Sequence, residues 1–405
     1  MKFKIRTDCS LCSSQNLQQV LELPKTPLAN ELILKKKTQD HYPLSLLLCI
    51  SCGHLQLKEI IPPNRLFRKY LYVSGTSSVF IKHFENAASH IVKKTNIDKK
   101  DLIIEIGSND GTLLKKFQYL GFNNTLGVDP ANKIANIANK NGVETIPEFF
   151  NESVSNKILS SKGKARVILA NNVFAHSSDL IGITNAIYSL LDEKGYFIFE
   201  VSYLLDVIEK LLFDTIYHEH LSYHALKPLV PFFKKNGLHL FDVERINTHG
   251  GSIRCYVSKN KRNKSARLNK LLKIEETKKL FSLKIYKEFS KRIQKHGNEL
   301  KNKISYLKKE NKRICGFGAP AKLTTLMYTF NLRGSDFEFI IDDSKYKQGL
   351  LTPGLHIPIV SSNKLYEDDI EVCVVFAWNF FKSIIKSHSK WKINGKLFIN
   401  PLKSN

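Results

Sequence analysis

Four short aliphatic runs, separated by helical stretches, occupy the middle of this 405-residue chain and constrain its fold more than any other feature. Each has the length expected of a buried strand: Leu102–Ile106, Thr125–Val128, Val167–Ala170 and Phe197–Val201. Strands that alternate with helices build a doubly wound parallel sheet. A second set of strand-like runs follows at residues 313–317, 337–341 and 372–377. The sequence therefore predicts an α/β protein with two Rossmann-like sheets.

The length predicts more than one unit, because a single hydrophobic core rarely grows beyond about 250–300 residues. We expect a cysteine-rich module at 1–75, a central α/β domain at 76–258, and Lys-rich helices leading into a C-terminal α/β domain at 259–405. In the Lys-rich part, apolar residues from Ile285 to Leu307 recur mostly three or four positions apart, which is helical spacing.

Four of the seven cysteines lie in the first 52 residues, as two Cys-x2-Cys pairs. They are Cys9, Cys12, Cys49 and Cys52. Two such pairs can present four thiolates tetrahedrally to one Zn²⁺ ion and leave no position open for water, so we expect a structural zinc site. In a cytoplasmic chain this interpretation is favoured over disulfides. The 36 residues between the pairs predict an inserted hairpin or loop.

The net charge of +25 raises the question of a nucleic-acid or membrane partner. Residues 259–312 hold 19 Lys or Arg and 5 Asp or Glu, so more than half of the excess charge lies in one helical segment. Such a segment is usually a solvated helix face and sometimes a binding surface. No apolar run approaches the roughly 20 residues that span a bilayer, and we recognise no signal peptide. We therefore expect a cytoplasmic protein without a nucleic-acid partner.

The segment Glu105-Ile-Gly-Ser-Asn-Asp-Gly111 joins the first central strand to a helix. Glycines at such a turn let the backbone approach a ligand closely. The Glu-x-Gly-x3-Gly spacing differs from the Gly-x-Gly-x2-Gly fingerprint of dinucleotide-binding turns. The polar side chains of the turn suit a zwitterionic amino-acid moiety better than a pyrophosphate. The turn therefore predicts a site for S-adenosylmethionine, with the candidate ligands Glu105, Gly107, Ser108, Asn109 and Gly111.

Polar residues also follow the second and third central strands. Asp129 lies 24 residues after Glu105, an offset at which a carboxylate can bind both hydroxyls of a ribose. NAD enzymes share this feature, so Asp129 alone does not discriminate between the cofactors. Asn171 and Asn172 close the third strand, and ligands of open α/β sheets bind beyond the carboxyl ends of the strands. We expect all three residues beside the S-adenosylmethionine turn.

The stretch Tyr217-His-Glu-His-Leu-Ser-Tyr-His224 is too polar for a core element. It lacks the His-Glu-x2-His arrangement of helical zinc sites, so general acid–base chemistry is favoured over metal ligation. Histidine titrates near neutral pH, and a tyrosine can donate a hydrogen bond to a developing oxyanion. We expect His176 at the same rim as Asn172. The turn His249-Gly-Gly-Ser-Ile-Arg254 suits an anionic or sugar substrate.

Taken in order, these motifs resemble those of the nucleotide-sugar C-methyltransferases, which act on keto-deoxy sugars. The matching stretches span nearly the whole chain: Cys9-x2-Cys12, Pro27-Leu-Ala-Asn30, Cys49-x2-Cys52-Gly, Tyr70-x-Tyr72-x-Ser74-Gly75, Glu105 to Gly111, Tyr217-His-Glu-His, His249-Gly-Gly-Ser-x-Arg254, Gly318-Ala-Pro-Ala-Lys322 and Lys347-Gln-Gly-x3-Pro-Gly-x-His-Ile-Pro358. The resemblance implies an N-terminal zinc-binding module, a central class I Rossmann-like methyltransferase domain, and a C-terminal Rossmann-like domain that helps hold the nucleotide. It implies two cofactors, S-adenosylmethionine and a structural Zn²⁺ ion.

The resemblance also implies roles for individual residues. The catalytic base falls on His220, with Tyr217, Glu219 and His176 around the sugar. The residues implied to bind the substrate are Tyr72, Ser74, His249, Arg254, Lys322, Asp342 and Lys347. Two positions depart from the family pattern, since His224-Ala225 replaces Phe-Ser and Leu323 replaces Gly. Either departure could change which substrate is accepted.

A sugar carbon becomes nucleophilic only beside a ketone, where a base can remove a proton and leave an enolate. We therefore expect methyl transfer to C3 of a 4-keto-6-deoxy sugar linked to TDP, GDP or CDP, with His220 as base and Tyr217 or His176 donating to the enolate oxygen. In-line positioning would supply most of the catalysis. Three alternatives stay open: a zinc-knuckle RNA methyltransferase, an N- or O-methyltransferase of a sugar or small molecule, and an inactive scaffold. The RNA alternative leaves the His-rich stretch unexplained.

Overall fold

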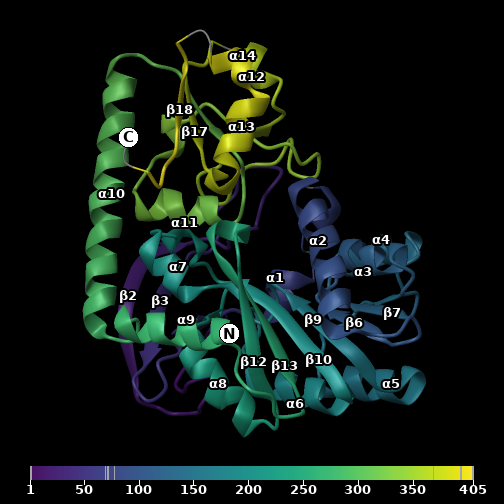
Figure 1. Ribbon diagram of the computed structural model, residues 1–405. Coiled ribbons are helices and arrows are strands. Elements are labelled where there is room, and N and C mark those ends of the chain that lie inside the picture. The colour runs from purple at the N-terminus through teal and green to yellow at the C-terminus, as the bar shows by residue number, and fades with distance from the viewer. Residues whose placement is uncertain are drawn as a thin grey trace.

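The computed structural model describes residues 2–68, 70, 73–76, 78–367, 369–392 and 395–403. Within this part of the chain the strands form sheets of seven, five, four and two strands. Figure 1 shows the seven-stranded and four-stranded sheets in the lower part of the molecule and the five-stranded sheet above them. The predicted α/β class, with two Rossmann-like sheets and an N-terminal cysteine cluster, is confirmed.

The seven-stranded sheet has the order β12-β13-β10-β9-β6-β7-β8. Strands β6 to β10 are parallel, as predicted, whereas β13 runs antiparallel to β10 and β12. The antiparallel edge arises because the His249-Gly-Gly stretch is the turn of a hairpin, in which Gly250 and Gly251 adopt φ angles of 91° and 151°. The strands are β6 Ile103–Ile106, β7 Thr125–Val128, β8 Thr145–Ile146, β9 Ala165–Asn171, β10 Leu191–Ser202, β12 His239–Ile246 and β13 Ser252–Ser258.

Helices cover both faces of this sheet, because parallel strands bury their side chains on both sides. Ile103 and Val167 pack with α2 and α3 on one face, whereas Ile104 and Ile168 pack with α6 and α8 on the other. The helices of this region are α2 Ser78–Thr95, α3 Thr112–Tyr119, α4 Asn132–Lys140, α5 Glu152–Lys162, α6 Leu180–Leu190, α7 Leu204–Glu209 and α8 Leu226–Lys235, with the 3-10 turns η2 Phe213–Thr215 and η3 Thr248–Gly250.

The N-terminal module provides three strands of an antiparallel sheet with the order β11-β4-β3-β2. The hairpin predicted between the two cysteine pairs is β2–β3. The fourth strand, β11 (Ser222–Tyr223), comes from the middle of the chain and pairs with β4, so the polar stretch at 217–224 lies against this module. The N-terminal elements are β1 Lys4–Ile5, β2 Leu17–Thr26, β3 Tyr42–Cys49, β4 Leu55–Leu57, β5 Glu59–Ile60, α1 Pro63–Phe67 and η1 Ser74–Thr76.

The five-stranded sheet is parallel throughout, with the order β16-β15-β14-β17-β18. The strand predicted at 337–341 is shorter in the structure, where β15 has two residues, and Phe337 and Phe339 are buried in the segment that enters it. The elements are β14 Ile314–Phe317, α11 Lys322–Thr329, η4 Gly334–Asp336, β15 Ile340–Ile341, β16 Ile359–Val360, α12 Lys364–Glu367, β17 Val372–Val375, η5 Trp378–Phe380, α13 Phe381–Ser387, α14 Ser389–Lys392 and β18 Leu397–Ile399.

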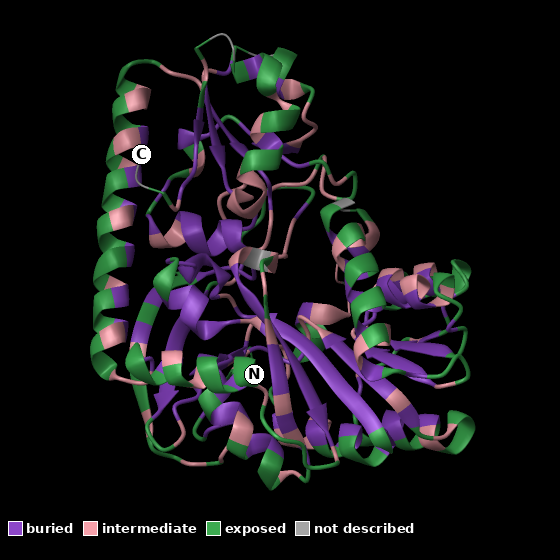
Figure 2. Cartoon of the chain, in the orientation of Figure 1, coloured by how far each residue is buried: buried purple, intermediate pink, exposed green. Residues whose placement is uncertain are grey.

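The Lys-rich segment forms α9 (Ala266–Thr277) and α10 (Leu283–Lys309). α10 runs along one side of the molecule, beside the five-stranded and the four-stranded sheet, and buries Phe289, Ile293 and Leu300 on its inner face. Figure 2 shows that its outer face is exposed. None of the helices in the described residues is long and apolar enough to cross a membrane.

The C-terminal sheet is attached to the other two parts through α11 and the loop after β15. Thr325 Oγ1, on α11, donates a hydrogen bond to Ile216 O at 2.7 Å. Gly354 N donates to Gln39 Oε1 at 2.8 Å, and Ile33 forms a β-bridge with Leu351. These contacts place α11 beside the polar stretch at 217–224.

Candidate active site

One cavity of about 1110 Å³ lies where the three parts of the chain meet. The carboxyl ends of β6, β7, β9 and β10 open into it from one side, and those of β14 and β15 from the other. Leu66, Phe67 and Asn30 of the N-terminal module complete the wall. A cavity for one drug-sized ligand measures about 300–1,000 Å³, so this cavity has room for two ligands side by side.

The glycine turn after β6 lies beside this cavity. At two of its positions the φ angle and the close neighbours require glycine. Gly107 and Gly111 have φ angles of 67° and 78°. An added Cβ would lie 2.3 Å from Val173 at the first position and 2.8 Å from Val143 at the second. Asn109 in the same turn lines the cavity with Gly107. The turn is therefore shaped by close packing behind it, which leaves its front open to a ligand.

Asp129, Asn171 and Asn172 all line the cavity beside this turn, as expected. Asp129 accepts hydrogen bonds from Asn109 N and Ala131 N, both at 2.9 Å, which fixes the carboxylate at the end of β7. A carboxylate offers about four acceptor sites, so Asp129 retains capacity for two ribose hydroxyls. This donor and acceptor set fits the ribose of S-adenosylmethionine.

Glu105 and Ser108 lie behind the turn, and neither lines the cavity. Glu105 Oε1 accepts from Asn171 Nδ2 at 3.4 Å, and burial raises the pKa of Glu105 well above its ordinary value. Glu105 Oε2 and Ser108 Oγ are buried without a hydrogen-bond partner among the described residues. Both residues, and Gly111, therefore support the turn in this structure and do not reach the cavity.

The polar stretch places Tyr217 and His220 on the wall of the same cavity as the cofactor turn. His220 Nδ1 lies 2.7 Å from Thr215 O, a carbonyl that can only accept, so Nδ1 carries the proton. His220 Nε2 lies 2.8 Å from the Tyr217 hydroxyl, which donates to it. Burial lowers the pKa of His220 to about 4. His220 is therefore a neutral imidazole with a basic nitrogen at the cavity.

His176 also lies at this rim, and its ring stacks on His220 with the centroids 5.1 Å apart. Glu219 is buried and does not line the cavity. Its Oε1 accepts from Asn30 Nδ2 at 2.8 Å, and burial raises the pKa of Glu219 to about 7. Glu219 thus links the catalytic stretch to the N-terminal module.

The C-terminal sheet contributes Asp342, Lys347 and Lys322 to the cavity wall. Asp342 Oδ2 accepts from Ala319 N at 2.8 Å and lies 3.2 Å from Lys347 Nζ. Lys322 Nζ donates to Asn379 Oδ1 at 2.8 Å. The turn at 318–319 and these two lysines form the polar part of the cavity wall that comes from the C-terminal part of the chain.

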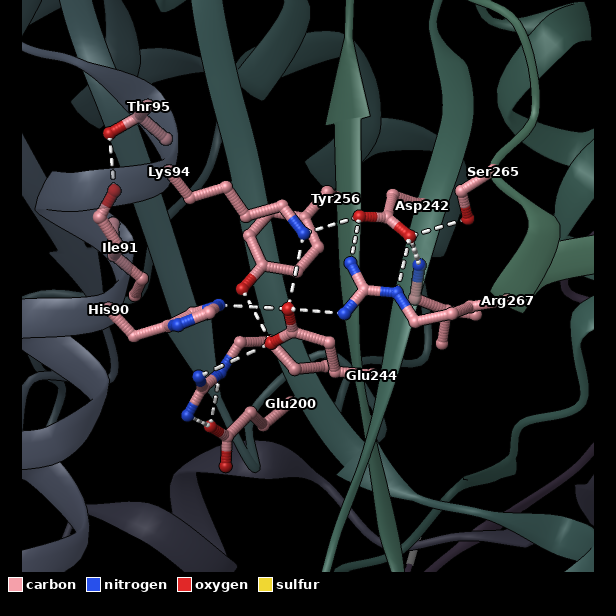
Figure 3. Close-up of polar contacts among 12 residues, drawn as sticks. His90, Ile91, Lys94, Thr95, Glu200, Asp242, Glu244, Tyr256, Ser265 and Arg267 are labelled. Carbon is pink, nitrogen blue, oxygen red and sulfur yellow. Dashed lines mark hydrogen bonds and ion pairs between the residues drawn. The ribbon is translucent and has the colours of Figure 1, made fainter.

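Arg254 does not reach the cavity, contrary to its expected role in substrate binding. It is buried in β13, where its Nε donates to Glu200 Oε1 at 2.7 Å. Figure 3 shows the wider cluster of carboxylates and basic side chains, in which Lys94 of α2 and Arg267 of α9 meet at Glu244, each 3.1 Å away. The cluster holds α2 against the sheet edge. The expected role of Arg254 was wrong, because its guanidinium group is paired with Glu200 inside the sheet.

The structure describes the expected substrate residues Ser74, Tyr72 and His249 to different extents. Ser74 lines the cavity, and its backbone N–H donates to Asn109 Oδ1 at 2.9 Å. Tyr72 lies outside the described residues. His249 belongs to the hairpin turn η3, and its side chain also lies outside what the structure describes.

Sequence reasoning did not single out Asn30, which lines the cavity, or Asp214 and Trp378, which lie behind the wall residues Thr215 and Lys322. Asn30 stands in the Pro27-Leu-Ala-Asn30 stretch, which was a usable signal. Asp214 and Trp378 are 164 positions apart, and Trp378 Nε1 donates to Asp214 Oδ2 at 2.5 Å. No local pattern announces this pair, because only the docking of the C-terminal sheet brings the two residues together.

The four N-terminal cysteines converge as predicted. Their sulfur atoms all lie within 4.8 Å of one another, and the Cys9–Cys52 and Cys12–Cys49 distances are 3.6 Å. Four sulfurs bound at about 2.3 Å to one tetrahedral zinc ion lie about 3.8 Å apart. The cluster therefore fits a Zn²⁺ ion with four thiolate ligands.

Comparisons with known proteins agree with this arrangement. Residues 9–67 match a zinc binding domain of methyltransferases, residues 80–243 a methyltransferase domain, and residues 247–402 a C-methyltransferase C-terminal domain. The chain is 31% identical over 400 residues to the C-methyltransferase NovU of Streptomyces niveus, with 98% of this chain and 95% of NovU covered. The chain belongs to this C-methyltransferase family. It is therefore an enzyme that transfers a methyl group from S-adenosylmethionine to carbon, and it carries a zinc-binding domain.

Solved structures show more distant likenesses to the C-methyltransferase. Magnesium protoporphyrin IX methyltransferase of Synechocystis is 13% identical, with 44% of this chain and 83% of that chain covered and a TM-score of 0.35. An S-adenosylmethionine-dependent methyltransferase of Clostridium acetobutylicum is 17% identical, with 45% and 92% covered and the same TM-score of 0.35.

The two departures of this C-methyltransferase from the family pattern lie behind the cavity. His224 and Leu323 are both buried, and neither lines the cavity wall. The His224 ring lies between Phe174 and His54, with centroid distances of 5.5 and 5.6 Å. These positions therefore bear on packing, and they reach a substrate only through the residues in front of them.

Replacing His224 with phenylalanine should raise the thermal midpoint of unfolding. Neither imidazole nitrogen has a hydrogen-bond partner among the described residues, and an unsatisfied buried polar group costs about 1–3 kcal/mol. Burial lowers the pKa of His224 to about 4. The unfolded state binds the proton more tightly, so the wild type loses stability as pH falls from about 6.5 toward 4. The variant should lack that share of the loss.

Thermal unfolding of both proteins at about pH 7.5 and about pH 5 measures the two effects separately. The gap between the midpoints should widen at the lower pH. Equal midpoints at both values would mean that the folded protein satisfies or charges His224.

Proposed function

We propose that this enzyme methylates C3 of a nucleotide-linked 4-keto-6-deoxy sugar, by way of an enolate formed when His220 removes a proton. The observation that carries the proposal is the single cavity that joins the cofactor turn, His220 and the C-terminal turn with Lys347. A ligand that reaches from His220 to Lys347 must have a reactive end and an anionic end. A sugar linked to a nucleoside diphosphate has this form.

S-adenosylmethionine would lie along the carboxyl ends of β6, β7 and β9. We assign its amino-acid part to Gly107 and Asn109 and its ribose to Asp129. Asn171 and Asn172 would lie beside the bound cofactor. The reason is that all five residues line the cavity at the carboxyl ends of these strands. Bound there, the cofactor supplies an electrophilic methyl group on a sulfonium ion. Glu105, Ser108 and Gly111 would act by holding the turn in place.

His220 Nε2 would accept the proton from the carbon beside the ketone. The hydrogen bond from Nδ1 to Thr215 O fixes the tautomer, so the lone pair stays at the cavity. The Tyr217 hydroxyl, which donates to Nε2 in this structure, or His176 would turn to the ketone oxygen when the sugar binds. The electron pair of the carbon then forms the new bond to the methyl group, and positioning of the two reactants supplies most of the rate.

Incubating the enzyme with S-adenosylmethionine and a panel of TDP-, GDP- and CDP-linked 4-keto-6-deoxy sugars tests the proposal. One sugar should gain a single methylene by mass spectrometry, and NMR should place it on C3. Transfer to nitrogen or oxygen would establish one of the alternative methyltransferases. If no sugar is methylated while RNA is, in a manner that weakens steeply with salt, the sugar proposal is wrong.

A further inference from the structure

Lys322 is a buried lysine that faces the cavity with unused hydrogen-bond donors. It is the first residue of α11, is 9% exposed, and lines the cavity. Its Nζ lies 3.7 Å from the centre of the Trp378 ring and donates one hydrogen bond, to Asn379. An ammonium group has three N–H donors, so two remain without a protein acceptor in the described part of the chain. A buried charged group with N–H donors that lack acceptors raises the free energy of the folded protein, unless a ligand accepts those hydrogen bonds.

The cavity offers few positive charges to a ligand. Among the described residues, Lys322 and Lys347 are the only Lys or Arg side chains on its wall. Lys347 Nζ lies 3.2 Å from Asp342 Oδ2 and donates to Ala319 O at 2.9 Å, so its charge is compensated at the C-terminal turn. Lys322 has no ion-pair partner within 4.0 Å among the described residues. The carboxylate of Asp214 acts on its charge from beyond that distance, so Lys322 is less closely compensated than Lys347.

The surroundings of Lys322 direct it toward the catalytic stretch. Its ammonium lies on the face of Trp378, whose indole N–H donates to Asp214 at 2.5 Å. Asp214 precedes Thr215, the residue whose carbonyl accepts from His220. The charge of Lys322 acts on His220 as well and, after burial, contributes to lowering the pKa of His220. Lys322 thus acts on His220, whereas Lys347 is held by Asp342 and by the carbonyl of Ala319.

Removing a proton beside a ketone moves a negative charge onto the ketone oxygen. The Tyr217 hydroxyl and the imidazole of His176 can each donate a hydrogen bond, but a buried ammonium also contributes a full positive charge in a medium of low dielectric constant. We propose that Lys322 is a catalytic residue whose ammonium group stabilises the enolate oxygen formed when His220 takes the proton. The inference rests on the proposed function.

The step balances without a further reactant. The C–H electron pair moves onto the ketone oxygen while the proton goes to His220 Nε2. Lys322 donates a hydrogen bond to that oxygen and keeps its own proton. The electron pair returns through carbon as the bond to the methyl group forms, and the ketone is restored. S-adenosylhomocysteine is the leaving group.

The test compares Lys322→Met and Lys347→Met on the sugar that the panel identifies. With S-adenosylhomocysteine in place of the methyl donor, NMR in D₂O measures deuterium uptake at the carbon beside the ketone. Lys322→Met should slow this uptake and kcat about 10²–10³-fold, as the loss of one oxyanion donor does elsewhere. KM should change less than about 3-fold, because the charge forms only during the reaction. Lys322→Arg should recover part of the rate, whereas Lys347→Met should act mainly by raising KM.

A second readout follows the His220 imidazole by NMR titration without any sugar. The groups that contact His220 are Tyr217, His176 and Thr215 O, and the charge that acts on it is that of Lys322. Lys322→Met should therefore raise the pKa of His220. Lys322→Gln, which also has no charge, replaces the methionine variant if the latter does not fold.

Two outcomes would overturn the inference. Unchanged deuterium uptake with a raised KM would assign Lys322 to the diphosphate of the substrate. An unchanged His220 titration would show that the two groups do not interact. Failure of the proposed function is a different result, since the wild type would then take up deuterium into no sugar of the panel.

Discussion

Replacing His220 with glutamine should lower kcat about 10³-fold, because loss of a general base typically costs between 10² and 10⁴ in rate. Glutamine retains a donor for Thr215 O but has no nitrogen that can accept the proton. The same variant should stop deuterium uptake at the carbon beside the ketone, since uptake requires removal of that proton. Binding of S-adenosylmethionine, measured by calorimetry, should stay within about 3-fold of the wild type, since His220 is not part of the cofactor turn.

His218 provides a matched control two positions earlier in the chain. It is also buried, and burial lowers its pKa to about 4, as for His220. His218 Nε2 lies 2.9 Å from Pro43 O, away from the cavity. His218→Gln should therefore reduce stability while kcat stays within about 5-fold of the wild type. If the two variants lose activity equally, the stretch matters for folding, and the assignment of the base to His220 is wrong.

The pH dependence of kcat/KM gives another readout of the same prediction. An ordinary histidine base loses activity as pH falls through about 6.5, because protonation fills its lone pair. Burial lowers the pKa of His220 to about 4, so the imidazole stays neutral well below that value. The acid limb of the profile should therefore appear near pH 4 to 5, provided that the fold persists, rather than near 6.5. A limb near 6.5 would mean that His220 is solvated when the enzyme works, or that another histidine is the base.

The parts of this fold that were predictable from sequence are those fixed over short stretches of chain. The four central strands and the glycine turn at Gly107 depend on neighbouring residues, because strand burial and a positive φ are local requirements. The two cysteine pairs likewise signal their zinc site by spacing alone. The carboxyl-end rule then placed Asp129 and the pair Asn171–Asn172 on the cavity wall, although Asp129 is distant from the pair in sequence.

The parts that were not predictable depend on pairings between distant segments. Strand β11 joins a sheet whose other strands lie more than 160 residues earlier, with Ser222 opposite Gln56. Its Gly-rich stretch suggested that Arg254 is free to bind a substrate, but Arg254 is paired with the carboxylate of Glu200 on the neighbouring strand. Glu219 does not line the cavity either, and it accepts a hydrogen bond from Asn30, which is 189 positions earlier in the chain. The division of the chain at residues 75 and 258 stays a prediction, and β11 shows that the parts share strands.

This shared sheet makes the zinc cluster important for a reaction that it does not touch. Replacing Cys49 with serine should release the metal and lower the thermal midpoint of unfolding by at least about 5 °C, since structural zinc binding is worth about 10 kcal/mol or more in small domains. Cys49 ends β3, which pairs with β4, and β4 in turn pairs with β11 of the catalytic stretch. Loss of zinc should therefore also remove activity, through disorder at His220.

Cys373 is the matched control, because it is equally buried but lies in the C-terminal sheet, far from the cluster in sequence. Cys373→Ala should retain one zinc ion per chain by elemental analysis and most of the activity, with a modest loss of stability. A Cys49→Ser variant that retained both zinc and full activity would contradict the structural assignment.

Metal exchange then distinguishes a structural ion from a catalytic one. Four thiolates leave no coordination site open to water or substrate, so the ion has no route into the chemistry. Cadmium, which also favours thiolate ligands, should restore the fold of the metal-free enzyme and kcat to within about 3-fold of the zinc form. A Lewis-acid role would instead make kcat follow the identity of the metal. The expected insensitivity of kcat, together with the dependence of folding on any thiolate-binding ion, would mean that the cluster contributes by holding β11 and, through it, His220 at the cavity.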